Sequence, residues 1–372
     1  MRPSTRSVVA VSALAGILAG MASGATDGGR SREPQRRVIP VAGELQALAM
    51  DGGRLAYDIA ADPSARTRER RCNRVLVWTL ATRRTTKVSG SLTCSADSTS
   101  TGAGVRELAV AGERVAWIVN RGGNTESGDQ LLASSVRRPR ERRLASASRS
   151  GNVDCVLSGR WVGGLVGDRD LLAYNVWTTR AANPGQSCAM RITSGAVRRI
   201  VGARTAPIAG GTDVVVAKDA DRGRIAVLRA DGGVELLSQR GRLLRRFGTT
   251  GVREVALGGD LLVVLTRARM LEVYGVRSGA LISSHPVPAG AAHLDAAPRL
   301  ATYSAGGRLH LVQLPNGRDV VVATVSRRIL DATIESSGLA YGYGLPWTRR
   351  LGSRGRIVFV PMALVLRSLG EA

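Results

Sequence analysis

A short phrase recurs along the whole chain, and this recurrence limits the folds open to it more than any other feature. Each copy is an apolar strand, a turn built around Asp or Gly, and a second strand with Leu or Val, then Ala, then an aromatic or another apolar residue. The copies cover residues 48–57, 108–117, 165–174, 208–216, 255–264, 294–303 and 330–341. A repeat of this kind indicates an array of similar small units rather than one irregular core.

A second hairpin follows each phrase, so every unit has four short strands. Residues 271–284, 308–323 and 224–237 show it, with Ser-Gly, Pro-Asn-Gly and Asp-Gly-Gly at the turns. The second strands begin near residues 55, 115, 172, 214, 262, 300 and 339. Four-stranded antiparallel units of roughly 40 to 45 residues are typical of β-propeller blades. We therefore predict seven blades, with six or eight as variants and a β-sandwich as the alternative fold.

The strand endings and the hairpins resemble the degenerate repeats of secreted bacterial propellers of the TolB-like, WD40-like and quinoprotein-like groups. The resemblance rests on the Leu/Val-Ala-Tyr/Trp strand and on hairpins such as residues 273–281, and it covers about residues 40 to 368. It implies an architecture but no particular family, because these groups include scaffolds, periplasmic partners and some enzymes. The Gly-His and Trp-Asp marks of WD40 repeats are absent from the sequence.

The N-terminus has the organisation of a secretory signal peptide. Arg2 and Arg6 precede an uncharged apolar run over residues 8–20, and Ser23-Gly24-Ala25 forms a small-x-small cleavage site. We predict a signal peptide over residues 1–25, a flexible tether over 26–37 and one propeller domain over 38–372. No transmembrane span is expected after cleavage, since the apolar segment 357–366 is short, contains Pro361 and is assigned to two short strands. The expected location is the periplasm, the cell envelope or the outside of the cell.

Four cysteines remain in the mature chain, namely Cys72, Cys94, Cys155 and Cys188. An even number in an exported chain predicts two disulfides, and their spacing leaves three pairings open. Placement on the blades favours Cys72 with Cys94 and Cys155 with Cys188, because each pair then joins two connections on one rim. Insertions before the third strands of blades one, two, three and seven (residues 59–72, 120–129, 178–188 and 344–355) decorate the same rim. We predict that this disulfide-bearing rim is the binding face.

Few residues carry recognisable chemistry. His293 and Asp295 stand two residues apart in a predicted innermost strand, so they are candidates for a binding or acid–base pair in the central channel. The segment Asp219-Ala-Asp-Arg-Gly223 resembles part of a calcium loop, but it lacks the later acidic ligands and is interpreted as a hairpin turn. No catalytic residue, metal site or cofactor is predicted.

The charge of the chain is strongly positive, with 53 basic and 29 acidic residues and a formal net charge of +24. Only Lys87 and Lys218 are lysines, which indicates a bias of composition toward arginine more than a dedicated phosphate-binding surface. Aromatic residues make up only 3% of the chain, so the stacking platforms of single-strand nucleic-acid readers are missing. We expect non-specific attraction to polyanions at low salt and no specific nucleic acid.

Taken together, these features predict an exported, non-catalytic propeller that binds a protein or a cell-wall component. Two other functions stay open. One is a propeller enzyme of lyase or hydrolase type with a site at the mouth of the central channel; the other is an electrostatic binder of anionic polymers.

Salt concentration separates the electrostatic function from the others. Affinity for a polyanion is expected to fall by orders of magnitude between low and physiological ionic strength, whereas a partner recognised by shape keeps its affinity. Binding curves at several salt concentrations measure the difference.

Overall fold

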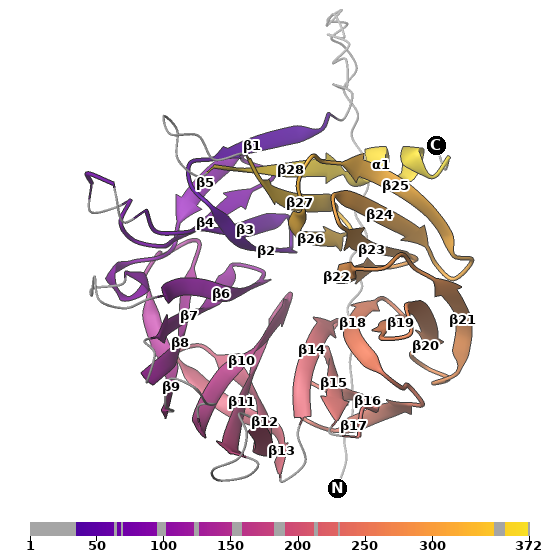
Figure 1. Cartoon of the computed structure of the whole chain (residues 1–372), viewed down its shortest axis with the longest axis horizontal. Helices are drawn as coiled ribbons and strands as arrows, with labels where there is room; N and C mark the ends of the chain where they lie inside the picture. The colour runs from indigo at the N-terminus through magenta and orange to yellow at the C-terminus, as the bar shows by residue number, and fades with distance from the viewer. Residues whose placement is uncertain are drawn as a thin grey trace, which may run out of the picture. The chain divides into compact units, whose positions relative to one another are not determined.

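The fold is described from a computed structural model, which places residues 35–62, 65–67, 70–94, 102–122, 126–150, 158–181, 190–211, 215–229, 231–345 and 354–370. The predicted signal peptide and nearly all of the predicted tether lie outside these residues. The described chain forms antiparallel sheets around a common centre, and the innermost strand of each sheet borders that centre (Figure 1).

Seven four-stranded blades follow one another in chain order, as predicted. Blade one comprises β2 (Leu45–Asp51), β3 (Arg54–Ile59), β4 (Arg74–Thr79) and β5 (Arg84–Lys87), and the 3-10 helix η1 (Ser91–Thr93) follows it. Blade two comprises β6 (Gly102–Ala111), β7 (Arg114–Gly122), β8 (Glu126–Ser135) and β9 (Arg142–Ser150). Blade three comprises β10 (Ser158–Asp168), β11 (Leu171–Ala181), β12 (Met190–Val201) and β13 (Arg204–Gly211).

The second half of the ring has the same composition of strands. Blade four comprises β14 (Val215–Asp221), β15 (Arg224–Arg229), β16 (Val234–Ser238) and β17 (Leu243–Phe247). Blade five comprises β18 (Val252–Gly258), β19 (Leu261–Thr266), β20 (Met270–Gly275) and β21 (Leu281–Pro286). Blade six comprises β22 (Ala291–Ala297), β23 (Leu300–Ala305), β24 (Arg308–Gln313) and β25 (Arg318–Thr324). Blade seven comprises β26 (Ile329–Glu335), β27 (Gly338–Gly344), β28 (Gly355–Pro361) and, from the N-terminus, β1 (Arg37–Val41).

The hydrophobic core is divided among the seams between blades. Each of the seven seams contains one apolar cluster to which both adjoining blades contribute. In the seam between blades one and two, for example, Val75 and Val77 pack with Val115 and Trp117, and all four are fully buried. A blade therefore buries both faces of its sheet only when it has a neighbour on each side, which rules out the β-sandwich.

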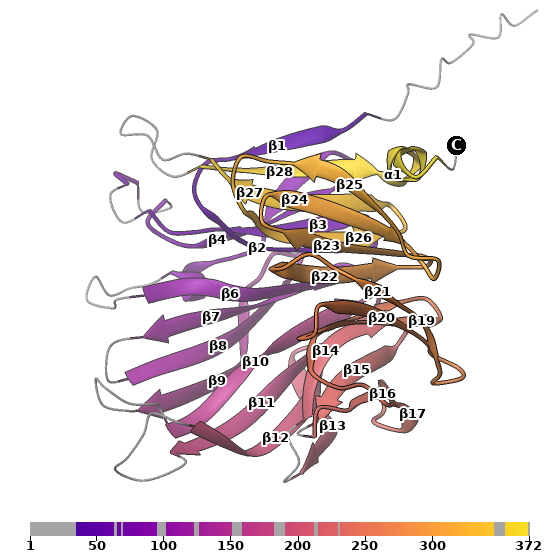
Figure 2. The same cartoon turned by 45° about the vertical axis from the view of Figure 1, so that its right-hand side comes forward.

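Strand β1 closes the ring. It pairs antiparallel with β28 from Arg37 opposite Phe359 to Val41 opposite Gly355, so the first and last strands of the chain share one blade (Figures 1 and 2). Val41 is buried in the seam between blades seven and one. Arg37, the last residue of the predicted tether, is the first residue of this strand.

Blades two and three are joined edge to edge into one eight-stranded sheet. The join pairs Ser150 with Ser158 and Arg149 with Gly159. Gly159 has a φ of +142°, and a Cβ atom there would lie 2.6 Å from the carbonyl oxygen of Ser148. A glycine is therefore required at this point for the two strands to meet.

The structure corrects three details of the sequence analysis. Blade four is shifted by one strand, because residues 208–216 span the end of β13 and the start of β14, and the second strand is β15 rather than a strand near residue 214. Residues 120–129 of blade two are not an insertion, since β7 and β8 extend through most of them. The segment after Pro361 is a helix, α1 (Met362–Ser368), instead of a strand.

Helix α1 has a clear physical cause. The outer edge of β28 is already paired with β1, so the chain after Pro361 does not add a strand beside β28. Its apolar residues Val365 and Leu369 are instead buried against the cluster between blades six and seven. Among the residues that the structure places, no helix is long and apolar enough to cross a bilayer.

Removing β1 is expected to destabilise the ring. A variant that starts after Val41 loses the strand that completes blade seven and the burial of Val41, which alone contributes about 2 kcal/mol. Chemical denaturation measures the loss, and a variant that starts at Gln35 is the control that keeps β1. Equal stability of the two variants would contradict closure by this strand.

Candidate functional site

The innermost strands of all seven blades enclose a central pocket of about 470 Å³. Its wall runs along β2, β6, β10, β14, β18, β22 and β26 to the turns that connect each of these strands to the second strand. A cavity of this volume is within the range that binds small molecules.

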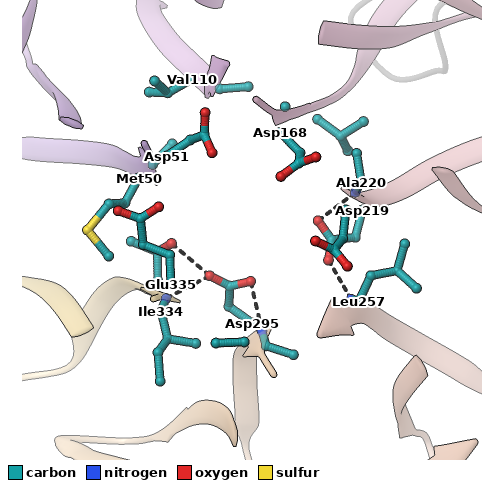
Figure 3. A pocket seen from close by; sticks show the side chains of 18 of the residues that line it. Met50, Asp51, Val110, Asp168, Asp219, Ala220, Leu257, Asp295, Ile334 and Glu335 are labelled. Carbon is teal, nitrogen blue, oxygen red and sulfur yellow. Dashed lines mark hydrogen bonds between the residues drawn. The ribbon is translucent and has the colours of Figure 1, made fainter. Parts of the chain in front are cut away.

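The lining reverses the charge of the chain. Seven carboxylates line the pocket, against the three cationic side chains of Arg169, Lys218 and Arg222. The carboxylates belong to Asp51, Asp168, Asp219, Asp221, Asp295, Asp331 and Glu335. Figure 3 labels Asp51, Asp168, Asp219, Asp295 and Glu335, which come from blades one, three, four, six and seven and surround the pocket.

Backbone irregularities explain why polar side chains of one blade bond to the innermost strand of the next. Each innermost strand has a register shift where it pairs with the second strand, such as the one between Gly163 and Val166. A bulge leaves a backbone N–H without a partner in its own ladder. A buried N–H of this kind needs an acceptor, and a carboxylate of the neighbouring blade is a strong one.

Acceptors from the preceding blade satisfy the N–H groups at or beside four of these bulges. Leu165 donates to Glu107 at 2.8 Å, Leu294 to Glu254 at 2.7 Å and Leu48 to Asp331 at 3.1 Å. Ala217 donates to the side-chain oxygen of Asn175 at 2.8 Å. These bonds connect blades two to three, five to six, seven to one and three to four.

A second set of bonds lies nearer the turns. It connects the three remaining seams and adds to the seam between blades seven and one. Leu257 donates to Asp219 at 2.6 Å, Ile334 to Asp295 at 2.8 Å, and Gly112 to Asp51 at 2.5 Å. Gly52 and Gly53 both donate to Glu335, at 2.9 and 3.1 Å. Every seam of the ring thus has at least one bond from a backbone N–H to a polar side chain of the adjoining blade. We call the bonds of both sets together the clamp ring, and their acceptor side chains the clamp residues.

Burial in the pocket shifts the titration of several clamp carboxylates. Burial raises the pKa of Asp295 to about 6, against the hydrogen bonds from Thr333, Ile334 and Ala296 that lower it. The pKa of Asp219 is raised well above its usual value, first by burial and then by the nearby charge of Asp295. Burial also raises the pKa of Glu335, and Asp51 adds to this effect.

Asp168 differs from the other carboxylates of the pocket. Its Oδ2 atom is buried and has no hydrogen-bond partner. Its pKa is raised first by burial and then by the charges of Asp221 and Asp51. This carboxylate is therefore held near two others without the full set of donors that the clamp residues have.

His293 and Asp295 both line the pocket, but each contacts blade seven instead of the other. Asp295 accepts hydrogen bonds from the Thr333 hydroxyl at 2.7 Å and from the Ile334 N–H. The Nδ1 atom of His293 lies 3.6 Å from Asp331. The expected strand alternation is interrupted, because His293 sits in a bulge with a φ of +58°. Their role as a channel site stays a prediction.

The segment Asp219-Ala-Asp-Arg-Gly223 forms the end of β14 and the turn to β15, which agrees with the interpretation as a hairpin turn. Asp219 and Asp221 accept the N–H groups of Leu257 and Gly259, so both serve in the clamp ring. Over the described parts of the chain, no group of three or more His, Cys, Asp or Glu side chains is arranged to hold a metal ion.

On the rim, Cys72 and Cys94 form the predicted disulfide. It joins the connection between β3 and β4 to the segment that leaves blade one. Arg121 holds the same segment by donating to the carbonyl oxygens of Leu92 at 2.7 Å and Cys94 at 3.0 Å. Cys155 and Cys188 lie outside the described residues, so their pairing stays a prediction.

The sequence analysis named Asp295 as a channel candidate and Asp219 and Asp221 as part of a turn, but it did not find their bonds to the adjoining blade, and it missed Asp51 and Glu335. A signal is present, because Asp51, Asp221 and Glu335 each stand at the last position of a first strand. An acidic residue there is also a common turn former, so the repeat identified the turn but not the bond to the next blade.

Comparisons with known proteins support the fold and show no family. No family model matches the chain, and no curated protein matches it. Among solved structures, the chain is similar to a chain of the "Crystal Structure of Mitotic Checkpoint Complex", with a TM-score of 0.52 and 12% sequence identity. The similarity covers 94% of this chain and 98% of that one. At this identity it establishes the shared propeller fold.

The raised pKa of Asp295 predicts a pH-dependent stability. Because the folded state keeps this proton up to about pH 6 and an unfolded aspartate releases it near pH 3.9, the free energy of unfolding falls as pH rises from about 4 to 6. The fall attributable to this residue is about 3 kcal/mol. Denaturation curves measured at several pH values test it.

The comparison variant is Asp295→Asn, which cannot release a proton and is expected to lose this part of the pH dependence. Asp260→Asn, at a half-exposed turn residue outside the pocket, is the control. Parallel stability profiles for the wild type and Asp295→Asn would count against a raised pKa at Asp295.

Proposed function

We propose that this chain is an exported, non-catalytic binding and scaffold module that acts at the cell envelope or outside the cell. Its partner is a protein or a cell-wall component, bound by the loops of the disulfide-bearing rim. The observation that carries this proposal is the position of the long connections. Those between the second and third strands of blades one, three and seven are long, while the same turns in blades four to six are short.

These long connections emerge from the rim that carries the Cys72–Cys94 disulfide. In a propeller, the connections from second to third strands and from one blade to the next leave the sheets at the same end. The closed ring holds their ends in fixed positions, and loops on a rigid scaffold are where binding residues concentrate. The disulfide restrains the blade-one connection further.

The clamp ring favours a structural role for most of the central pocket. Glu335 receives two backbone N–H groups and the Ser337 hydroxyl, and Asp295 receives two backbone N–H groups and the Thr333 hydroxyl. Each of these hydrogen bonds uses an acceptor position of the carboxylate, so fewer positions remain to take a proton from a bound substrate. This arrangement supports a binding module over an enzyme with its site in the channel.

Export is supported by two independent observations. The N-terminal sequence has the three parts of a signal peptide, and the structure contains a disulfide. Disulfides persist mainly in oxidising compartments such as the periplasm and the extracellular space.

Photo-crosslinking from the two rims tests the binding face. Arg66 is an exposed residue of the blade-one connection, and Arg138 is an exposed residue of the β8–β9 turn on the opposite rim. Each is replaced in turn by benzoylphenylalanine, and whole cells are irradiated. A discrete adduct is expected from position 66 and none from position 138. The two variants lose the same charge, so they form a matched pair.

Salt distinguishes a specific partner from polyanion attraction. The position-66 adduct is expected to survive a rise from about 50 to 200 mM salt, over which binding through several phosphate contacts falls by about a thousandfold or more. An adduct that disappears over this range, or one that forms equally from both positions, would contradict the proposal.

A further inference from the structure

A groove of about 490 Å³ lies beside helix α1, on the rim opposite the disulfide. Its walls are the β22–β23, β24–β25 and β26–β27 turns and one side of α1. Most of the lining is apolar and comes from Pro298, Leu300, Leu314, Pro315, Met362 and Leu366. Its volume is within the range of cavities that bind small molecules. We call it the helix groove.

Helix α1 presents apolar residues on two of its sides. Val365 and Leu369 are buried in the cluster between blades six and seven, and they attach the helix to the ring. Met362 and Leu366 are four residues apart, so they lie one above the other on another side of the helix, and both line the groove. Each is only half-buried. Apolar surface gathered in this way around one cavity, rather than scattered singly, is typical of a binding site.

The charge of the lining is positive. Among the residues that the structure describes, one cationic side chain, Arg299, and no carboxylate line the groove. Arg299 is an exposed residue of the β22–β23 turn, and its carbonyl oxygen accepts the Leu314 N–H at 2.8 Å, which holds the turn beside β24. Within the described chain its guanidinium forms no ion pair or hydrogen bond. It is therefore available to an anionic group in the groove.

The acidic central pocket adjoins the helix groove, and the two have three lining residues in common, Ala297, Pro298 and Ser336. The nearest carboxylate in sequence is that of Glu335, which already accepts two backbone N–H groups and one hydroxyl. A ligand cation would compete with these donors. A ligand anion meets the unpaired guanidinium of Arg299, so the charge of the groove favours an anion.

We propose that the helix groove binds a small amphipathic monocarboxylate. Its unbranched apolar chain lies along Met362 and Leu366 and loses contact with water there, while its carboxylate pairs with Arg299. A planar guanidinium matches a carboxylate with two parallel hydrogen bonds, and a single cation matches a single negative charge. The site is on the rim opposite the proposed binding face, so it adds a second binding function that does not depend on the first.

Titration calorimetry on the full chain at physiological salt tests the proposal. The probes are hexanoate, octanoate and decanoate, with decyltrimethylammonium as a ligand of opposite charge, all below the concentrations at which they form micelles. Saturable binding is expected, with affinity rising about fourfold for each added methylene because each one is removed from water in the groove. Decanoate is expected to bind at least tenfold more tightly than decyltrimethylammonium.

An arginine variant separates recognition from folding. Arg299 has a φ of +64°, a conformation that favours glycine, so Arg299→Gly is expected to leave the temperature of thermal unfolding unchanged or to raise it. The same change removes the partner of the carboxylate, and affinity for decanoate is expected to fall by about tenfold. Arg269→Gly is the matched control. It removes the same charge at a φ of +62°, but in the β19–β20 turn on the disulfide-bearing rim, and affinity is expected to stay the same.

A methionine variant tests the apolar wall. Met362→Gln keeps an unbranched side chain of similar length and replaces the thioether by a polar amide. The loss of affinity is expected to be several-fold for decanoate and smaller for hexanoate, because only the longer chain extends along the whole wall.

Absence of binding, equal affinity for all three chain lengths, or equal or tighter binding of decyltrimethylammonium would overturn the proposal. Equal affinity for decanoate in Arg299→Gly and Arg269→Gly would overturn it as well, because the attraction would then come from net charge alone. Sedimentation velocity detects the other occupant, a second copy of the chain: a dimer that Met362→Gln dissociates would contradict a small ligand. The crosslink from position 66 reports on the opposite rim, so the two proposals fail separately.

Discussion

Closure of the ring is the constraint on which the rest of the structure depends. Each blade has two apolar faces, and neither face can be covered by the blade itself, so the seven seam clusters form only when seven blades complete a circle. Pairing of β1 with β28 closes this circle, because the first and last strands of the chain lie side by side in one sheet. The clamp ring adds directional bonds between neighbouring blades at the narrow inner edge.

The clamp ring also explains an acidic pocket inside a chain with a net charge of +24. N–H groups at the bulges and near the turns of the innermost strands need acceptors, and carboxylates satisfy them better than neutral acceptors do. Burial first, and neighbouring carboxylates second, raise the pKa of Asp295 and Asp219, so ionisation of these groups inside the pocket opposes folding. Seven carboxylates and three cationic side chains line the pocket, so the net charge of the chain is a poor guide to this inner surface.

The sequence by itself determined the architecture, because an alternating strand pattern with Gly and Asp turns repeats at a nearly constant interval. It also determined the Cys72–Cys94 pairing once the blades were placed. It misjudged blade four and the segment after Pro361, since a short apolar stretch has the same pattern in a last strand, a first strand or a helix. Only the tertiary structure decided which edge was free for β1.

Only the tertiary structure showed which backbone groups the carboxylates of the pocket bond to. Asp51 bonds to Gly112 on the next blade, and Asp331 bonds to Leu48 across the closure of the chain, 283 residues away in sequence. A side chain's partner in another blade depends on bulges and on the twist of two sheets, and neither is encoded in local spacing. For the same reason the spacing of His293 and Asp295 did not predict that both contact blade seven, because a bulge at His293 interrupts the alternation of side chains along the strand.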